Sequence, residues 1–277
     1  MSFVYENGVP VGIKVNDIIS ENDGDIVIAV LLASILPSVP AADLIVDVGA
    51  DKGWFSQFAR LFCKNTIYAF EPNYISYKGL VESIRNIENI IVLPIAVSAS
   101  ETQICLQLAD GQTHCRRQPS VPTTPDLQST NNSQTQIAIC KPLDSLIEKG
   151  RQISFLKIDT EGHDFEVLRS ATSLIEGGRV SNIVFEYTAF WVADTAADAV
   201  AESVKMFKWL GQHYKYMYAL SRRGVPYMVG PLKSADFASF AADHFERHLQ
   251  TDLFLTNNPA PLNALTIYAF EPGKYYA

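Results

Sequence analysis

A glycine-containing turn follows an apolar run near the start of the chain, and its residue types suit ligand binding. Leu44-Ile-Val-Asp-Val-Gly-Ala-Asp-Lys-Gly-Trp-Phe-Ser56 contains the pattern D-x-G-x-x-x-G, formed by Asp47, Gly49 and Gly53. The apolar run predicts a strand that is buried on both faces. Gly49 lets the chain turn sharply and lets a ligand approach the backbone, and Gly53 begins the next helix without a side chain in the way. Because ligands of doubly wound sheets bind beyond the strand ends, we expect a ligand site here.

The charge of this turn separates two classes of cofactor. Asp51 stands where the dinucleotide-binding pattern G-x-G-x-x-G has its second glycine, so a carboxylate would lie beside a pyrophosphate and repel it. S-adenosylmethionine carries no phosphate, and carboxylates attract its sulfonium and ammonium groups. Glu71, in Tyr68-Ala-Phe-Glu-Pro-Asn73, lies about 20 residues after the turn and ends the next expected strand, where it can accept hydrogen bonds from ribose hydroxyls. We therefore expect S-adenosylmethionine rather than a dinucleotide.

Several segments resemble, in order, those of the FkbM-type methyltransferases. The resemblance covers roughly residues 44 to 187, and one departure is Asp51, where the family pattern usually has Asn. It implies an S-adenosylmethionine-dependent O-methyltransferase acting on a hydroxyl of a small molecule or sugar. The matching segments are Asp47-Val-Gly-Ala-Asp-Lys-Gly-Trp-Phe-Ser56, Phe70-Glu-Pro-Asn73, Ala96-Val-Ser98, Leu143-Asp144, Lys157-Ile-Asp-Thr-Glu-Gly162 and Phe185-Glu186. The expected cofactor-binding residues are Asp47, Gly49, Ala50, Asp51, Gly53, Glu71, Pro72, Asn73, Ala96 and Asp159.

Titratable residues gather where the fourth expected strand ends. Methyl transfer to oxygen needs an aligned nucleophile and a group that takes its proton. Asp159 is expected to orient the acceptor or to face the methionine end of the cofactor. His163 can act as a base or simply face solvent in a first helical turn. The expected catalytic residues are Asp159, Glu161, His163 and Glu186, with Asp164 also in this region.

Lys157 lies inside a buried strand and needs a partner. Strand side chains alternate, so Lys157 and Asp159 should share a face. A buried lysine is costly unless it is paired, and Glu186 on the adjoining strand is the expected partner. A structural pair and a functional pair are both compatible with the sequence.

The order of elements predicts how the site is held. Short apolar runs alternate with helical stretches, which predicts βαβ units. The resemblance implies an α/β Rossmann-like class I methyltransferase fold, with a mostly parallel seven-stranded sheet and helices on both faces. We expect an N-terminal helical extension over 1–43, with a helix near Ile26–Leu36, a methyltransferase domain over 44–256 and a tail over 257–277. Within the domain, the polar stretch 111–136 is expected to be a loop or lid.

Composition restricts the partners. The formal net charge of −8 disfavours nucleic acid, and the run Ile26–Leu36 is too short to span a membrane. Four cysteines without a C-x-x-C pair, and no secretory signal pattern at the N-terminus, predict a cytoplasmic location. A divalent metal could lower the pKa of an acceptor hydroxyl, but no ligand spacing demands one. His244 and His248 are expected to be a surface pair rather than a zinc site, so no metal is predicted.

Two other functions fit parts of the pattern. An RNA ribose 2′-O-methyltransferase would use a Lys-Asp-Lys-Glu tetrad, of which Lys157 or Asp159 and Glu186 could supply part. A module that binds the cofactor without turnover is a third reading, which the intact glycine turn and the acidic cluster disfavour. Arg222-Arg223 and Arg116-Arg117 are expected to be solvated loop charges. The sequence leaves the identity of the acceptor and the oligomeric state unassigned.

Overall fold

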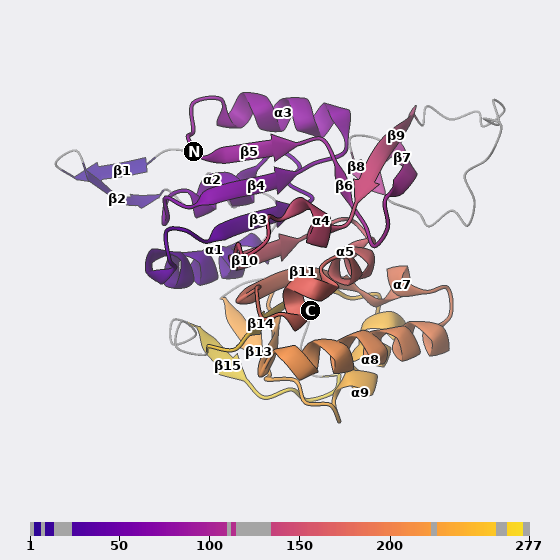
Figure 1. Cartoon of the computed structure of the whole chain (residues 1–277). Helices are drawn as coiled ribbons and strands as arrows, with labels where there is room; N and C mark the ends of the chain where they lie inside the picture. Colours follow the sequence, from indigo (N-terminus) through magenta and orange to yellow (C-terminus); the bar gives the residue numbers. More distant parts are fainter. Residues whose placement is uncertain are drawn as a thin grey trace.

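A nine-stranded sheet forms the centre of the molecule (Figure 1). The computed structural model describes residues 3–6, 9–13, 24–109, 112–114, 134–222, 226–258 and 265–273. The strand order is β15-β13-β12-β14-β11-β10-β3-β4-β5, so the order reverses beside β3, where ligands of doubly wound sheets bind. This arrangement confirms the predicted Rossmann-like α/β class. The predicted count of seven strands is wrong, because β13 and β15 extend the sheet beyond β12.

Six strands run in one direction and provide the edge at which the site lies. Parallel pairs join β10 to β3 and β11, and β4 to β3 and β5, whereas β14 runs antiparallel between β11 and β12. β13 is antiparallel to β12 and parallel to β15, so part of the stretch expected to be a tail belongs to the sheet. The strands are β3 (Leu44–Val48), β4 (Thr66–Phe70), β5 (Ile90–Leu93), β10 (Ile153–Ile158), β11 (Asn182–Thr188), β12 (Tyr216–Leu220), β13 (Tyr227–Val229), β14 (Gln250–Thr256) and β15 (Thr266–Tyr268).

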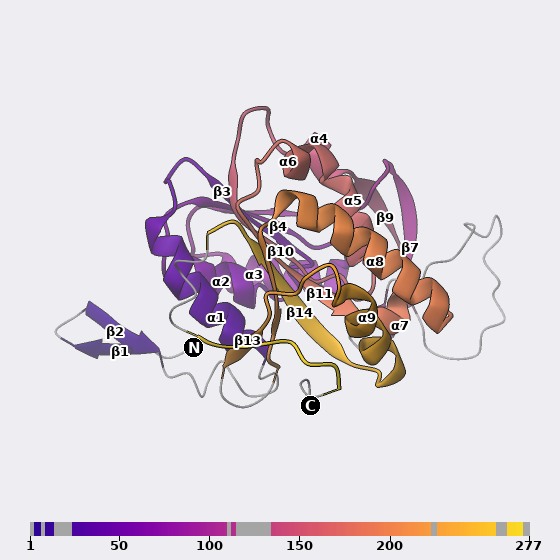
Figure 2. The ribbon, with the colours of Figure 1, turned by 90° about the horizontal axis from the view of Figure 1, so that it is seen from below.

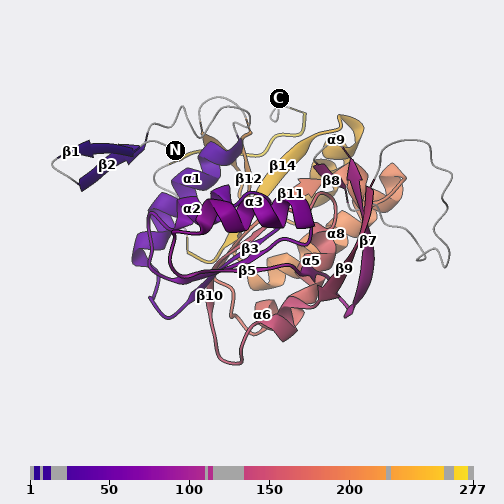
Figure 3. The ribbon, with the colours of Figure 1, turned by 90° about the horizontal axis from the view of Figure 1, so that it is seen from above.

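Helices cover both faces of the sheet (Figures 2 and 3). Strand residues such as Ile45 and Phe155 pack with α1 and α2, while their neighbours Leu44 and Leu156 face the core shared with α5, α8 and α9. Strands buried on both faces are apolar at nearly every position, which is why the sequence showed their runs clearly. The helices are α1 (Gly24–Ile35), α2 (Trp54–Ala59), α3 (Tyr74–Ile84), α4 (Leu143–Leu146), α5 (Asp164–Ser170), α6 (Thr172–Glu176), α7 (Ala189–Val192), α8 (Ala196–His213) and α9 (Phe237–Glu246).

A separate four-stranded sheet has the order β6-β9-β7-β8. It consists of β6 (Ala96–Val97), β7 (Thr102–Ala109), β8 (Gln112–His114) and β9 (Gln134–Lys141). β7 and β9 pair antiparallel and form a hairpin. Strands β8 and β9 take up both ends of the stretch expected to be a loop over 111–136, and the rest of that prediction lies outside the described residues.

Two further features concern the edges of elements. The largely apolar stretch 90–97 is divided into β5 and β6 at Pro94, which has no N–H to donate to a ladder. An antiparallel hairpin, β1 (Phe3–Glu6) and β2 (Val9–Ile13), precedes α1 in the stretch expected to be helical. Within the part of the chain that is described, no helix is both long enough and apolar enough to cross a membrane.

Candidate active site

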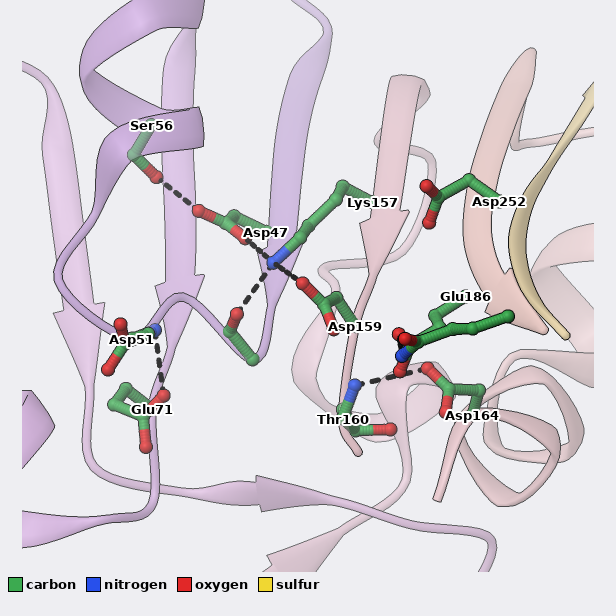
Figure 4. A network of polar contacts seen from close by, with 12 residues as sticks. Asp47, Asp51, Ser56, Glu71, Lys157, Asp159, Thr160, Asp164, Glu186 and Asp252 are labelled. Carbon is green, nitrogen blue, oxygen red and sulfur yellow. Dashed lines mark hydrogen bonds and ion pairs between the residues drawn. The ribbon is translucent and has the colours of Figure 1, made fainter. Parts of the chain in front are cut away.

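A buried lysine joins the glycine turn to the neighbouring strand (Figure 4). Lys157 Nζ lies 3.2 Å from Asp47 Oδ1 and 3.5 Å from Asp159 Oδ2, and it donates to the Gly49 carbonyl at 2.6 Å. Ser56 Oγ donates to the other oxygen of Asp47 at 2.8 Å. Burial lowers the pKa of Lys157, but the carboxylates of Asp47 and Asp159 outweigh it and hold that pKa above its usual range. Lys157 is therefore charged and fixes the turn and Asp159 relative to each other.

The predicted Lys157–Glu186 pair is wrong. In the sheet register, Lys157 lies opposite Asp47 on one side and opposite Val184 on the other. Glu186 is two residues farther along β11, about 6.6 Å at the usual strand rise. Asp47 is directly opposite and buried, so it takes the lysine.

The glycine turn packs directly against the ends of two strands. Gly49 has φ 75°, and a Cβ there would lie 1.8 Å from the Asp159 carbonyl oxygen. The N–H groups of Gly49 and Ala50 both donate to the Phe70 carbonyl at 3.0 Å. Asp51 has φ 42°, a left-handed conformation that Asn and Asp tolerate better than most residues. Backbone packing, not only ligand approach, thus requires glycine at position 49.

Gly53 meets a similar constraint at the start of α2. It has φ 84°, and a Cβ there would lie 2.3 Å from Leu80 Cδ1 on α3. The predicted cofactor residues Gly49, Ala50, Asp51 and Gly53 consequently form one tight turn between β3 and α2.

Glu71 binds this turn from the end of β4. Its Oε2 accepts from the Asp51 N–H and its Oε1 accepts from the Asn73 N–H, each at 2.8 Å. Burial raises the pKa of Glu71 to about 7, and these two hydrogen bonds offset part of the effect. Ser76 Oγ donates to Asp51 Oδ1 at 2.8 Å. The structure therefore brings the two predicted cofactor motifs into direct contact.

The four-stranded sheet contacts the same corner through Gln136, a residue the sequence did not single out. Gln136 Oε1 accepts from the Tyr74 N–H at 2.9 Å, and its Nε2 donates to the Pro72 carbonyl at 2.6 Å. Asn73, between these two residues, caps α3 by accepting from the Ile75 N–H at 2.9 Å. Ala96 lies on β6 of that sheet. Gln136 thus fixes β9 to the Glu71-Pro72-Asn73 segment.

Four carboxyl groups gather near the end of β10 and on the neighbouring strands β11 and β14. Glu186 and Asp252 face each other across the β11–β14 pair, and Arg222 Nη2 and Nε lie 3.3 Å from Glu186 Oε1 and Asp252 Oδ2 respectively. Asp164 accepts from the N–H groups of Thr160 and Gly162 at 3.1 and 3.2 Å. We call Asp159, Asp164, Glu186 and Asp252 the acidic cluster.

Three carboxyl groups of the acidic cluster have pKa values above their usual range. Burial, with the nearby charges of Asp159 and Asp164, raises the pKa of Glu186 to about 9. Burial and the charge of Asp159 raise the pKa of Asp164 to about 7. Burial also raises the pKa of Asp252, although Arg222 opposes the shift. Ionisation of these three groups is therefore disfavoured, because Arg222 does not offset burial and mutual repulsion.

The structure places the predicted catalytic residues in two groups. Asp159 and Glu186 belong to the acidic cluster. His163, at the N-terminus of α5, lies with Nε2 3.0 Å from Ser98 Oγ, and Glu161 occupies a left-handed turn with φ 52°. Sequence reasoning missed Gln250, whose side-chain amide donates to Glu186 Oε1. It also missed Asp252, because the sequence alone does not indicate that β14 pairs with β11.

Two expectations about charged and metal-binding side chains need correction. Arg222, expected to be a solvated loop charge, forms the ion pairs described above. His244, expected at the surface, is fully buried, and its Nδ1 lies 2.9 Å from the Phe240 carbonyl. Among the residues that the structure describes, no group of three or more His, Cys, Asp or Glu side chains could hold a metal ion.

Comparisons with known proteins identify the family. An rRNA methylase from Streptococcus thermophilus is 13% identical with a TM-score of 0.42, over 82% of this chain and 92% of that one. A precorrin-6y C5,15-methyltransferase from Geobacter metallireducens is 10% identical with a TM-score of 0.40, over 83% and 87%. No curated protein matches the chain. The model of the methyltransferase FkbM domain matches residues 47–218, more than half of the sequence. The chain therefore belongs to the FkbM methyltransferase domain family and is an S-adenosylmethionine-dependent methyltransferase.

Proposed function

We propose that the protein transfers a methyl group from S-adenosylmethionine to a hydroxyl of a small molecule or sugar. One observation carries this proposal: Lys157 holds the glycine turn of the cofactor motif against Asp159, the first carboxylate of the acidic cluster. A cofactor corner and a group able to accept a proton are thereby fixed side by side at one edge of the sheet (Figure 4). Such fixed proximity is what transfer between two bound molecules requires.

The residues around the turn suit this cofactor. The Asp51 carboxylate, in the turn that Glu71 contacts, would repel a pyrophosphate and attract an ammonium or sulfonium. Each Glu71 oxygen accepts one backbone N–H and retains acceptor capacity for a ribose hydroxyl. The proposed cofactor-binding residues are Asp47, Gly49, Ala50, Asp51, Gly53, Glu71, Pro72, Asn73, Ala96 and Asp159, with Asp47 acting through Lys157.

Asp159 is the proposed acceptor of the hydroxyl proton. When bound, S-adenosylmethionine supplies an activated methyl group whose sulfur leaves as a neutral thioether while the O–CH3 bond forms. The hydroxyl loses its proton in the same transfer, and a carboxylate within hydrogen-bond reach can take it. The Asp159 side chain is 41% exposed, in contrast to the buried Glu186, and the Lys157 ammonium 3.5 Å away orients it.

The other predicted catalytic residues have secondary roles in this proposal. Glu186 would orient the acceptor, and His163 and Glu161 would provide an alternative route for the proton from the loop after β10. An RNA acceptor is less well supported, because Glu186 contacts Arg222 and the overall charge is −8.

Two measurements test the proposal. Calorimetry should show binding of S-adenosylhomocysteine, weakened by about 1–3 kcal/mol in Glu71→Ala because the ribose hydroxyls lose their acceptor. Incubation with methyl-labelled S-adenosylmethionine and a panel of alcohols, sugars and RNA, followed by mass spectrometry, should place the label on a hydroxyl oxygen of a small acceptor. Label on RNA ribose, or binding without any transfer, would contradict the proposal and favour one of the two alternatives.

A further inference from the structure

The acidic cluster contains more carboxyl groups than the chain's own cations pair with. Its four carboxylates are met by Arg222, which contacts Glu186 and Asp252, and by Lys157, which Asp159 shares with Asp47. Asp164 accepts hydrogen bonds from the backbone N–H groups of Thr160 and Gly162, which carry no formal charge. Like charges this close disfavour ionisation unless a further cation joins them.

One atom of the cluster lacks the partner that burial demands. The Glu186 side chain is 3% exposed, and its Oε1 receives both Gln250 and Arg222. Its Oε2 is buried and has no hydrogen-bond partner within the described residues. A buried carboxylate oxygen without a donor is destabilising, so a donor from outside the chain would be bound favourably.

The position of this oxygen separates it from the cofactor corner. Gly49 and Glu71 follow β3 and β4, whereas Glu186 and Asp252 belong to β11 and β14, on the opposite side of β10. The sulfonium and ammonium of the cofactor belong with the former group in the proposed function. The unpartnered Glu186 Oε2 on β11 is therefore not accounted for by the cofactor.

We propose that the acidic cluster is a subsite for an ammonium group of the methyl acceptor, so that the substrate class is hydroxyl compounds carrying a neighbouring amine, such as amino sugars and amino alcohols. This inference rests on the proposed function. An ammonium group donates up to three hydrogen bonds, and its positive charge favours ionisation of neighbouring carboxyl groups. It therefore suits Glu186 Oε2 and Asp252, which lie on paired residues of β11 and β14. A phosphate or carboxylate on the acceptor would be repelled by the same carboxylates.

Matched pairs of compounds test the charge requirement directly. The protein is first saturated with S-adenosylhomocysteine, whose sulfur is neutral, and then titrated calorimetrically with D-glucosamine and with D-glucose. The second pair is trans-2-aminocyclohexanol and trans-cyclohexane-1,2-diol. We expect the amine of at least one pair to bind about ten-fold or more tightly than the compound that has a hydroxyl in its place. This factor corresponds to one charge-assisted contact of about 1.4 kcal/mol. Equal affinity within both pairs, including no binding, overturns the proposal.

Variants connect the preference to the cluster. Asp252→Asn should reduce the preference for the amine several-fold, and Glu186→Gln provides a second test if Asp252→Asn fails to fold. Glu82→Gln is the matched control, because Glu82 is an exposed carboxylate paired with Arg85 on α3, and it should keep the full preference. A preference that survives in both cluster variants contradicts the assignment.

The labelled-methyl reaction with the same four compounds tests hydroxyl methylation and the ammonium subsite separately. Label on an oxygen of D-glucose or the cyclohexanediol, without tighter binding of either amine, supports hydroxyl methylation and overturns the ammonium subsite. Label on nitrogen of the amines overturns hydroxyl methylation, while the binding preference still supports the subsite.

Discussion

Lys157 and Asp47 face each other across β10 and β3, with Nζ 3.2 Å from Oδ1 and both side chains buried. The pair connects what the sequence shows as two separate motifs, because Lys157 also binds the Gly49 carbonyl and Asp159. One interior lysine therefore sets the distance between the cofactor turn and the proposed proton acceptor.

Lys157→Met should destabilise the protein strongly, because it leaves Asp47 buried without its cation. Breaking one side of a buried pair typically costs about 3–5 kcal/mol. Chemical denaturation measures the loss. The double variant Asp47→Asn, Lys157→Met removes both charges and should recover part of the stability, and a double variant no more stable than Lys157→Met would show that the pair is not coupled.

Gly49→Ala should be far more damaging than Gly178→Ala. Both glycines have positive φ, 75° and 65°, but a Cβ at Gly49 would lie 1.8 Å from the Asp159 carbonyl oxygen, while nothing lies within 4 Å at Gly178. Gly178→Ala should cost about 1 kcal/mol from backbone strain alone. Gly49→Ala should in addition separate β3 from β10 and abolish binding of S-adenosylhomocysteine. Similar melting temperatures for the two variants would contradict this packing argument.

Gln136→Ala should raise the KM for S-adenosylmethionine several-fold and leave kcat nearly unchanged. The Gln136 side chain bonds to Pro72 and Tyr74, which follow the proposed ribose-binding residue Glu71 in the chain. It does not contact the acidic cluster. Gln103→Ala is the matched control, since Gln103 is exposed on β7 of the same sheet. Equal KM values for the two variants would remove Gln136 from the cofactor site.

The sequence predicted the parts of the site that depend on local pattern. The apolar runs of β3 and β10 and the D-x-G-x-x-x-G turn follow from strand burial and backbone geometry, and these are readable from neighbouring residues. The partner of Lys157 was mispredicted because it depends on sheet register. Asp47 and Glu186 are both carboxylates on adjoining strands, and only the alignment of β10 with β3 selects the first.

The remaining site residues depend on long-range topology. Asp252 enters the acidic cluster because β14 inserts antiparallel between β11 and β12. Gln136 reaches the Glu71-Pro72-Asn73 segment because β9 lies beside the start of α3. Neither placement leaves a periodic signal in the sequence. Arg222 and His244 were assigned to the surface from residue type alone, yet ion pairing and a hydrogen bond to the backbone let both be buried in part or in full.

Glu186→Gln should flatten the pH dependence of stability. The pKa of Glu186 is raised to about 9 in the folded protein, above its ordinary value of 4.5, so folding favours the protonated form. Stability from this group is fully present below pH 4.5 and is lost as the pH rises toward 9. Melting temperatures at pH 6 and pH 9 should differ less in Glu186→Gln than in the wild type or in Glu82→Gln. An equal difference in all three proteins would mean that Glu186 is already ionised at pH 6.

The turnover of Asp159→Asn tests the central claim most directly. The substitution keeps the size of the side chain but removes its ability to take the hydroxyl proton. With methyl-labelled S-adenosylmethionine and an acceptor identified by the screen, kcat should fall by about 10²–10⁴, the usual effect of losing a positioned acid or base. Melting temperature and S-adenosylhomocysteine affinity report folding and cofactor binding in the same preparation. A folded variant with wild-type cofactor affinity and wild-type kcat would contradict the account and move the proton acceptor to His163 or Glu161.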